Sequence, residues 1–403
     1  MARQTGSLTR RSDAQVFPLE LFFDLVFVFA VTQCTAIMAA ERTWAGMGRG
    51  LLALAVLWWS WTAYAWLTSV IDPEQDATRV TMFTAMGAML IVSVCVPQAF
   101  GGLALTFAVA YGVVRAVQIV LFALASPGDP DLRRSVALLA VSTTLAVGLL
   151  VAAAFVDPPV RELLWVLAVV SDFGGPFLFG SAGWRLVPGH FAERHAAVVI
   201  IALGESIVAI GAGTAPSDIT VPVVLVAVGG VFLSAALWWL HFDVVALATQ
   251  RRLSAMEPGQ ARNVLARDAY SYLHLVLVAG IVLLALGMKT TLADIDAPLR
   301  VQSGAALAGG VAVFLLGHVA FRWRFARTIN RERLGTGALL ILLVPLAPSV
   351  PAWVALAVVA AVTWALVVYE TTAWSDTRGF IRSSGGVPGD DGTVRSAPEE
   401  PAS

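Results

Sequence analysis

Long apolar runs separated by short polar segments fill the chain between residues 17 and 371. A bilayer core about 30 Å thick is crossed by roughly 20 helical residues, so runs of this length are typical of transmembrane helices. The pattern predicts twelve helices, at about 17–39, 48–71, 80–97, 101–125, 135–156, 161–182, 195–213, 220–246, 269–288, 301–321, 336–349 and 352–371. The expected fold is therefore an all-α, polytopic transmembrane helix bundle.

The arginines and lysines give this bundle an orientation, because cytoplasmic loops carry an excess of both residue types. If the N-terminus is cytoplasmic, the inner segments hold 20 of the 26 Arg and Lys residues and the outer loops hold 5. The remaining cation, Arg115, lies inside the fourth predicted helix. We therefore expect a multi-pass protein of the bacterial cytoplasmic (plasma) membrane with both termini in the cytoplasm.

The two halves of the chain are alike. The second and eighth predicted helices contain the Trp-rich segments 58–61 and 238–241, and a polar segment with Asp and Arg follows each helix. Repeats with an even number of helices share one orientation, so the pattern predicts two parallel six-helix repeats. The alternative is that the tryptophans only mark the membrane interface. The expected organisation is an N-tail (1–16), a first repeat (17–182), a second repeat (183–374) and a disordered C-tail (375–403).

The composition excludes several classes of protein. Charged residues make up 13% of the chain, against about 25% in soluble domains. The net charge of −1 gives no reason to expect nucleic-acid binding. The expected partners are the lipid bilayer and an unknown small solute or ion, and a homo-oligomer is left open. Cys34 and Cys95 lie in apolar runs without metal-ligand spacing. Because no nucleophile–base or nucleotide-binding motif is present, we expect neither enzymatic activity nor a cofactor.

Among the charged residues inside the predicted helices, five fall where the bilayer would be, and they are the candidate ion- or substrate-binding residues: Glu20, Asp24, Arg115, Asp172 and Glu205. A charge at the centre of a bilayer costs about 2.5–3.5 kcal/mol on insertion scales, so it usually faces a partner or a cavity. Two arrangements are open: the side chains converge on one hydrated cavity, or each is paired in a dry contact between helices.

Glu20 and Asp24 share one face of the first helix because they are four residues apart. Two carboxylates this close favour a shared proton or a bound cation. The structural alternative for Glu20 is a place at the helix N-terminus, where the dipole favours an acid.

Glu205 lies near the middle of the seventh helix, and we expect it to be the principal functional residue. Gly204 beside it is expected to permit a close helix contact. Arg115, taken as the only cation deep inside a helix, needs a carboxylate partner. Asp24, Asp172 and Glu205 are the candidates for that partner, with a substrate anion as the functional alternative.

Asp172 precedes Gly174-Gly175-Pro176. This tripeptide is expected to kink or interrupt the sixth helix, because proline removes a backbone hydrogen bond. Interrupted helices are a recurring feature of transporter binding sites. The segment 190–195 is expected to be a charged cytoplasmic loop before the seventh helix, and only loosely resembles a metal site. His241, His274 and His318 are interpreted as interface histidines, with metal or haem binding as the alternative.

Two motifs carry a family resemblance: LELFFDLVFVFA at 19–30, and HFAERH at 190–195 followed by LGESIV at 203–208. Together they resemble the signatures of the bacterial low temperature requirement A family, over roughly residues 11–371. The resemblance implies a polytopic inner-membrane protein linked to growth in the cold. It implies no particular substrate or reaction.

These features favour a secondary transporter coupled to protons or another cation. A cation channel is one alternative, since Phe22-Phe23-Asp24 is distantly similar to the Phe-Ser-Asp motif of potassium channels built from six-helix repeats. A non-catalytic membrane component that supports growth in the cold is another alternative.

Overall fold

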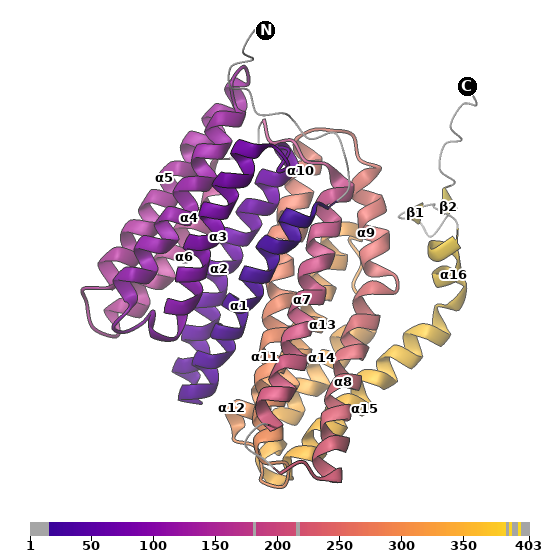
Figure 1. The fold of residues 1–403 in the computed structure, drawn as a ribbon. Helices are drawn as coiled ribbons and strands as arrows, with labels where there is room; N and C mark the ends of the chain where they lie inside the picture. The colour runs from indigo at the N-terminus through magenta and orange to yellow at the C-terminus, as the bar shows by residue number, and fades with distance from the viewer. Residues whose placement is uncertain (1–15, 180–182, 215–217, 384–386, 389–393, 396–403) are drawn as a thin grey trace. The chain divides into compact units, whose positions relative to one another are not determined.

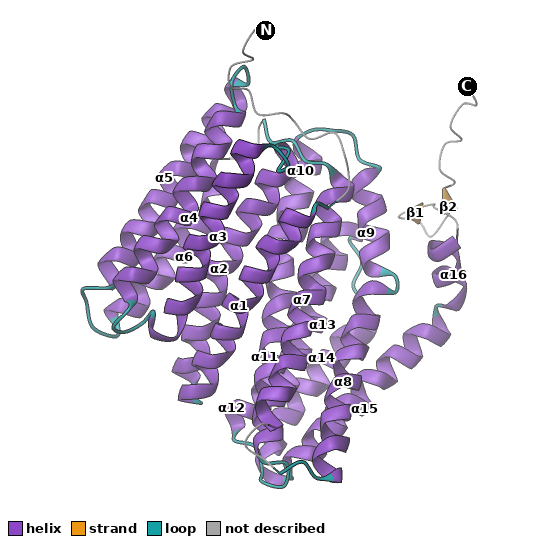
Figure 2. Ribbon diagram, in the orientation of Figure 1, coloured by secondary structure: helices purple, strands orange, loops and turns teal. Residues whose placement is uncertain are grey.

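The chain is helical almost throughout (Figures 1 and 2). The computed structural model describes residues 16–179, 183–214, 218–383, 387–388 and 394–395. Within these residues, eleven helical segments are long and apolar enough to cross a membrane. They coincide with eleven of the twelve expected spans, and the expected sixth span forms the helix α6 (Val160–Phe179). The expected all-α, polytopic bundle is confirmed.

The chain divides into two compact units, residues Met1–Arg194 with Pro258–Val264, and residues His195–Glu257 with Leu265–Ser403. In the first unit, α1 packs against α2 and α3, α3 against α4, and α5 against α6. The bounds of these helices are α1 Pro18–Glu41, α2 Trp44–Val70, α3 Asp76–Cys95 with the 3₁₀ turn η1 Val96–Gln98, α4 Ala104–Ala125 and α5 Pro130–Ala153. The helix α7 (Pro188–Thr214) begins in this unit and continues into the second.

Local signals explain where these helices begin. Pro18 occupies the first turn of α1, where its missing N–H is not needed. The side chains of Thr43 and Asp129 cap α2 and α5 by accepting hydrogen bonds from the backbone N–H groups of Gly46 and Leu132. Each cap satisfies a donor that the first helical turn leaves open.

In the second unit, α11 packs against α13, and α8 against α15. Its elements are α8 Val221–Phe242, α9 Val245–Ser254, the end of α10 (Gln260–Ala266), the π-helix η2 Arg267–Leu273, α11 His274–Ala293, α12 Val301–Gly304, the π-helix η3 Ala305–Gly309, α13 Gly310–Ala326, α14 Arg331–Leu343, the 3₁₀ helix η4 Val344–Ser349, α15 Ala352–Ala373 and α16 Ser375–Ser383. The short strands β1 (Val387–Pro388) and β2 (Val394–Arg395) pair antiparallel.

Glycines permit a close helix contact in this unit. A Cβ atom on Gly280 of α11 would lie 2.7 Å from the carbonyl oxygen of Gly310 at the start of α13. Small residues at such a crossing let two backbones approach within a membrane, where van der Waals contact replaces the hydrophobic effect between helices.

Local structure differs from the expectations in three places. The segment 190–195 is not a loop, because α7 already begins at Pro188. The helix α6 continues through Gly174-Gly175-Pro176, so the tripeptide does not interrupt it. A Cβ on Gly175 would lie 2.6 Å from Ser142 Oγ, so this glycine serves close packing of α5 on α6. The expected disordered C-tail begins with the helix α16, while 1–15, 384–386, 389–393 and 396–403 lie outside the described residues.

Candidate functional site

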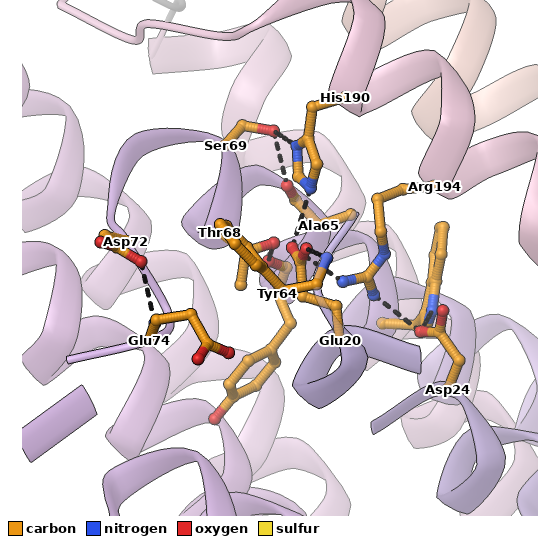
Figure 3. A network of polar contacts seen from close by, with 12 residues as sticks. Glu20, Asp24, Tyr64, Ala65, Thr68, Ser69, Asp72, Glu74, His190 and Arg194 are labelled. Atoms are coloured by element: carbon orange, nitrogen blue, oxygen red, sulfur yellow. Dashed lines mark hydrogen bonds and ion pairs between the residues drawn. The ribbon is translucent and has the colours of Figure 1, made fainter. Parts of the chain in front are cut away.

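A buried charge cluster joins α1 to the first turns of α7 (Figure 3). Glu20 and Asp24 on α1, and His190 and Arg194 on α7, are each 0% exposed. Each pair is spaced by four residues, so each helix presents both side chains on one face. Arg194 lies between the two carboxylates, with Nη1 3.1 Å from Glu20 Oε1 and Nη2 2.7 Å from Asp24 Oδ1.

Neighbouring groups fix the orientation of both carboxylates. The indole Nε1 of Trp61 donates to Asp24 Oδ1 at 2.8 Å, and the backbone N–H of Phe17 donates to Glu20 Oε2 at 2.9 Å. The Arg194 guanidinium lies 5.7 Å from the Trp61 ring centroid, within the range of a cation–π contact. Asp24 Oδ2 and Arg194 Nε are buried without a hydrogen-bond partner in the described part of the chain.

His190 extends the cluster to α2. Its Nε2 lies 2.8 Å from Glu20 Oε1, and its Nδ1 lies 3.1 Å from Ser69 Oγ. The Ser69 hydroxyl also lies 2.9 Å from the carbonyl oxygen of Ala65, one helical turn earlier. A chain of polar contacts therefore runs from Glu20 through the His190 imidazole to Ser69 (Figure 3). The Ser69 hydroxyl has two acceptors within reach, the imidazole Nδ1 and the backbone oxygen of Ala65.

A second buried cluster is centred on Arg115 of α4. Its Nη2 lies 3.0 Å from Asp172 Oδ1 on α6 and 2.7 Å from Thr143 Oγ1 on α5. Thr143 donates to the same Asp172 oxygen at 3.0 Å, and the Tyr111 hydroxyl donates to Asp172 Oδ2 at 3.1 Å. Of the three candidate partners for Arg115, Asp172 is the one observed.

Aromatic residues of α2 contact both clusters. Trp61 bonds Asp24, and the Tyr64 ring stacks on Phe23 with centroids 4.7 Å apart. The Tyr64 hydroxyl donates to the carbonyl oxygen of Val114, next to Arg115, at 2.9 Å. The Trp-rich segment therefore forms part of the interior of this unit, where the side chains of Trp58, Trp59 and Trp61 are buried.

Four of the five candidate charges are paired in the two buried clusters of the first unit. The cavity beside Tyr111 and Asp172 measures only about 10 Å³. Glu205 belongs to the second unit, where it is 2% exposed on α7. Ser206 Oγ beside it is buried without a hydrogen-bond partner in the described part of the chain. The close helix contact expected at Gly204 is wrong, because a Cβ there would meet no atom within 4 Å.

His190 and Arg194 were expected in a loop, and their place in the buried cluster was not predicted from the sequence. The matched i, i+4 spacing of Glu20/Asp24 and His190/Arg194 was the signal available. Arg115 is also not the only buried cation, because Arg194 is 0% exposed and Arg333 is 6% exposed.

The remaining histidines gather in the second unit. His241 Nδ1 lies 3.1 Å from His318 Nε2, and the ring of His274 lies 5.9 Å from that of His241 and 5.2 Å from that of His195. Tyr270, in the π-helix η2, stacks on His274 at 4.9 Å. Within the described residues, no group of three or more His, Cys, Asp or Glu side chains could hold a metal ion.

A multi-helix bundle with apolar spans and fully buried ion clusters defines an integral, multi-pass membrane protein. The family model described as "Bacterial low temperature requirement A protein (LtrA)" matches residues 15–368. The chain belongs to this family, as its two motifs predicted. It is similar to an uncharacterized protein of Rhizobium meliloti (strain 1021), with 32% identity over 316 residues that cover 75% of each chain. The comparison with solved structures gives no match.

Proposed function

We propose that this protein is a proton-coupled secondary transporter of the bacterial plasma membrane that supports growth at low temperature. The observation that carries the proposal is the buried contact between Glu20 and His190, with Ser69 on the far side of the imidazole. The solute is not specified by the proposal.

The charge of the α1–α7 cluster supports the binding of one proton. Two carboxylates face one guanidinium, so the cluster carries a net charge of −1 when His190 is neutral. Burying an uncompensated charge is costly. One added proton, held by His190 or shared with Glu20, makes the cluster neutral.

The hydrogen-bond geometry accommodates both protonation states without moving a heavy atom. With neutral His190, the Ser69 hydroxyl donates to Nδ1, and Nε2–H donates to Glu20. With protonated His190, Nδ1–H donates to Ser69, whose hydroxyl turns to the carbonyl oxygen of Ala65. A site that satisfies its hydrogen bonds in both states is suited to taking up and releasing a proton.

The same geometry favours a proton over a metal cation. Arg194 occupies the space between the two carboxylates, with contacts of 3.1 and 2.7 Å. A sodium ion placed there would lie beside a guanidinium and repel it. The position of Arg194 therefore supports protonation, rather than metal binding, as the route to cation coupling through this cluster.

Proton binding is tested on the full-length protein in lipid nanodiscs by infrared difference spectroscopy as the pH is lowered from about 8 to 5, the range in which histidines titrate. Glu20→Gln and His190→Gln should remove a carboxylate and imidazole signal that wild type shows. Glu41→Gln is the matched control, because Glu41 is an exposed residue of the same helix. An unchanged difference spectrum in both cluster variants would contradict the proposed proton site.

Coupling is tested with proteoliposomes that contain the pH indicator pyranine, to which a panel of small solutes is added. We expect a solute-dependent proton flux that Glu20→Gln and His190→Gln abolish and Glu41→Gln preserves. Solute uptake that does not respond to an imposed pH gradient would show that protons are not coupled. A cluster that only holds helices together would give folded variants with unchanged flux.

A further inference from the structure

A cavity of about 480 Å³ lies within the second unit, and none of the residues assigned to proton binding lines it. It is enclosed by the C-terminal ends of α8, α13 and α15, the start of α14, and the helices α9 and α16. Sites for small ligands typically measure about 300–1,000 Å³. The cavity is therefore large enough for a ligand.

The lining of the cavity is positively charged. Four guanidinium groups (Arg252, Arg322, Arg333 and Arg378) face it together with two carboxylates (Asp243 and Glu370), which gives a formal charge of +2. Arg333 binds Glu370 through Nε at 2.8 Å and Nη2 at 2.7 Å, and Arg378 Nε donates to Asp243 at 2.6 Å. The two acids are thereby engaged, and the excess charge favours an anionic ligand.

Arg322 provides donors for that anion. Its Nε donates to the Thr328 hydroxyl at 3.0 Å. Its two Nη groups have no hydrogen-bond partner in the described part of the chain, although the side chain borders the cavity. An arginine in this state can bind a carboxylate or phosphate through two parallel hydrogen bonds.

The remainder of the wall is apolar. Val245 and Ala248 of α9, Phe321 of α13 and Val367 of α15 contribute side chains to it. A hydrated inorganic anion would leave this surface without a partner, whereas an acyl chain would cover it.

The helix α16 closes one side of the cavity with Arg378 and Ile381. Asp243, the residue that ends α8, accepts from Arg378 and lies 3.4 Å from Arg382 Nη1. The hydrogen bond with Asp243 raises the pKa of Arg378 above its usual value. Arg251 of α9 also donates to the backbone oxygen of Ile381. The helix α16 is therefore held in place by contacts at Arg378 and at Ile381.

We propose that this cavity binds one amphiphilic anion, with its carboxylate or phosphate head on the arginines and its acyl chain along the apolar wall. On the topology predicted from the sequence, this end of the helices faces the cytoplasmic interface, where anionic lipids and free fatty acids are both present. The inference does not depend on proton coupling.

The test is native mass spectrometry of the full-length protein in a non-ionic detergent with three probes added separately: palmitate, phosphatidylglycerol and phosphatidylcholine. We expect one bound palmitate or one bound phosphatidylglycerol per chain, and the probe that binds identifies the source of the anion. Failure of wild type to retain either anion, or equal retention of phosphatidylcholine, would overturn the proposal.

Two matched pairs of variants locate the site. Ala248→Trp fills the cavity, and Ala246→Trp makes the same change on α9 at a residue that does not line it. Arg322→Gln removes the anion donors, and Arg331→Gln removes an exposed arginine that does not line the cavity.

Ala248→Trp and Arg322→Gln should weaken binding at least about tenfold, as expected for loss of a charge-assisted hydrogen bond or of the space for the chain. Ala246→Trp and Arg331→Gln should bind as wild type does. Arg322 is exposed, so its variant tests the site even if Ala248→Trp does not fold. Equal binding by Arg322→Gln and wild type would overturn the assignment of the head group to this arginine.

Discussion

Arg194 Nη2 lies 2.7 Å from Asp24 Oδ1, and neither side chain has any exposed surface. The two residues are 170 positions apart in the sequence and lie on α7 and α1. Their contact ties the two motifs of the family together inside the first unit. It also means that neither charge can be removed without leaving the other buried.

Replacing Arg194 by leucine should therefore destabilise the protein severely. Loss of one partner of a buried pair costs about 3–5 kcal/mol, because the remaining charge is uncompensated. The midpoint of denaturant-induced unfolding in detergent is the measurement. The matched control is Arg185→Leu, since the Arg185 side chain is 66% exposed and its pair with Asp129 spans 3.4 Å. Similar midpoints for the two variants would contradict the prediction.

The Arg115–Asp172 pair should behave as an exchangeable helix contact. Asp172→Leu alone leaves the guanidinium buried without its carboxylate, and should lower the unfolding temperature strongly. The double variant Arg115→Leu/Asp172→Leu should recover much of the loss, because apolar residues often replace a buried ion pair at no cost or with a gain of about 1–4 kcal/mol. A double variant no more stable than the single one would show that the pair has a further role.

Two adjacent glycines should respond differently to alanine. A Cβ on Gly310 would lie 2.5 Å from the backbone nitrogen of Leu284, whereas a Cβ on Gly309 would meet nothing within 4 Å. Gly310→Ala should cost about 1–3 kcal/mol through overpacking. Gly309→Ala should be neutral, or stabilising by up to about 1 kcal/mol. Thermal unfolding of the two proteins is the comparison, and equal unfolding temperatures would contradict the α11–α13 crossing.

Under the proposed function, Glu205→Gln should leave a folded protein in the membrane but abolish transport and the rescue of a cold-sensitive deletion strain, because it removes a carboxyl group that is buried on α7. Growth at low temperature and the amount of protein in the membrane fraction are the two measurements. Glu193→Gln is the control, because Glu193 is an exposed residue of the same helix, α7. Full rescue by Glu205→Gln would favour a non-catalytic membrane component.

The predicted orientation is tested with reporters at the C-terminus. A fluorescent protein fused there should fluoresce, and alkaline phosphatase fused there should be inactive, because the excess of arginine places this end in the cytoplasm. Active phosphatase would reverse the topology, and with it the side on which the proposed amphiphile site lies.

The sequence by itself determined the all-α class and the approximate positions of the helices. In lipid, the backbone N–H and C=O groups must bond to one another, and this leaves few alternatives to a helix for a long apolar run. It also determined the family, through motifs that include Glu20, Asp24 and Glu205. Helix ends were less well determined, and α7 begins at Pro188 where a charged loop had been expected. The two six-helix repeats and the cytoplasmic location of the termini stay predictions.

Only the tertiary structure decided which buried charges meet. Hydropathy assigns an arginine and a carboxylate to the membrane but not to each other, because the partner is chosen by which helix faces come into contact. Thus Arg115 had three candidate acids and pairs with Asp172, while Arg194 lies between Glu20 and Asp24. The arginine-lined cavity had no sequence signal at all, because residues between 239 and 381 come together there only after the helix ends of the second unit have packed.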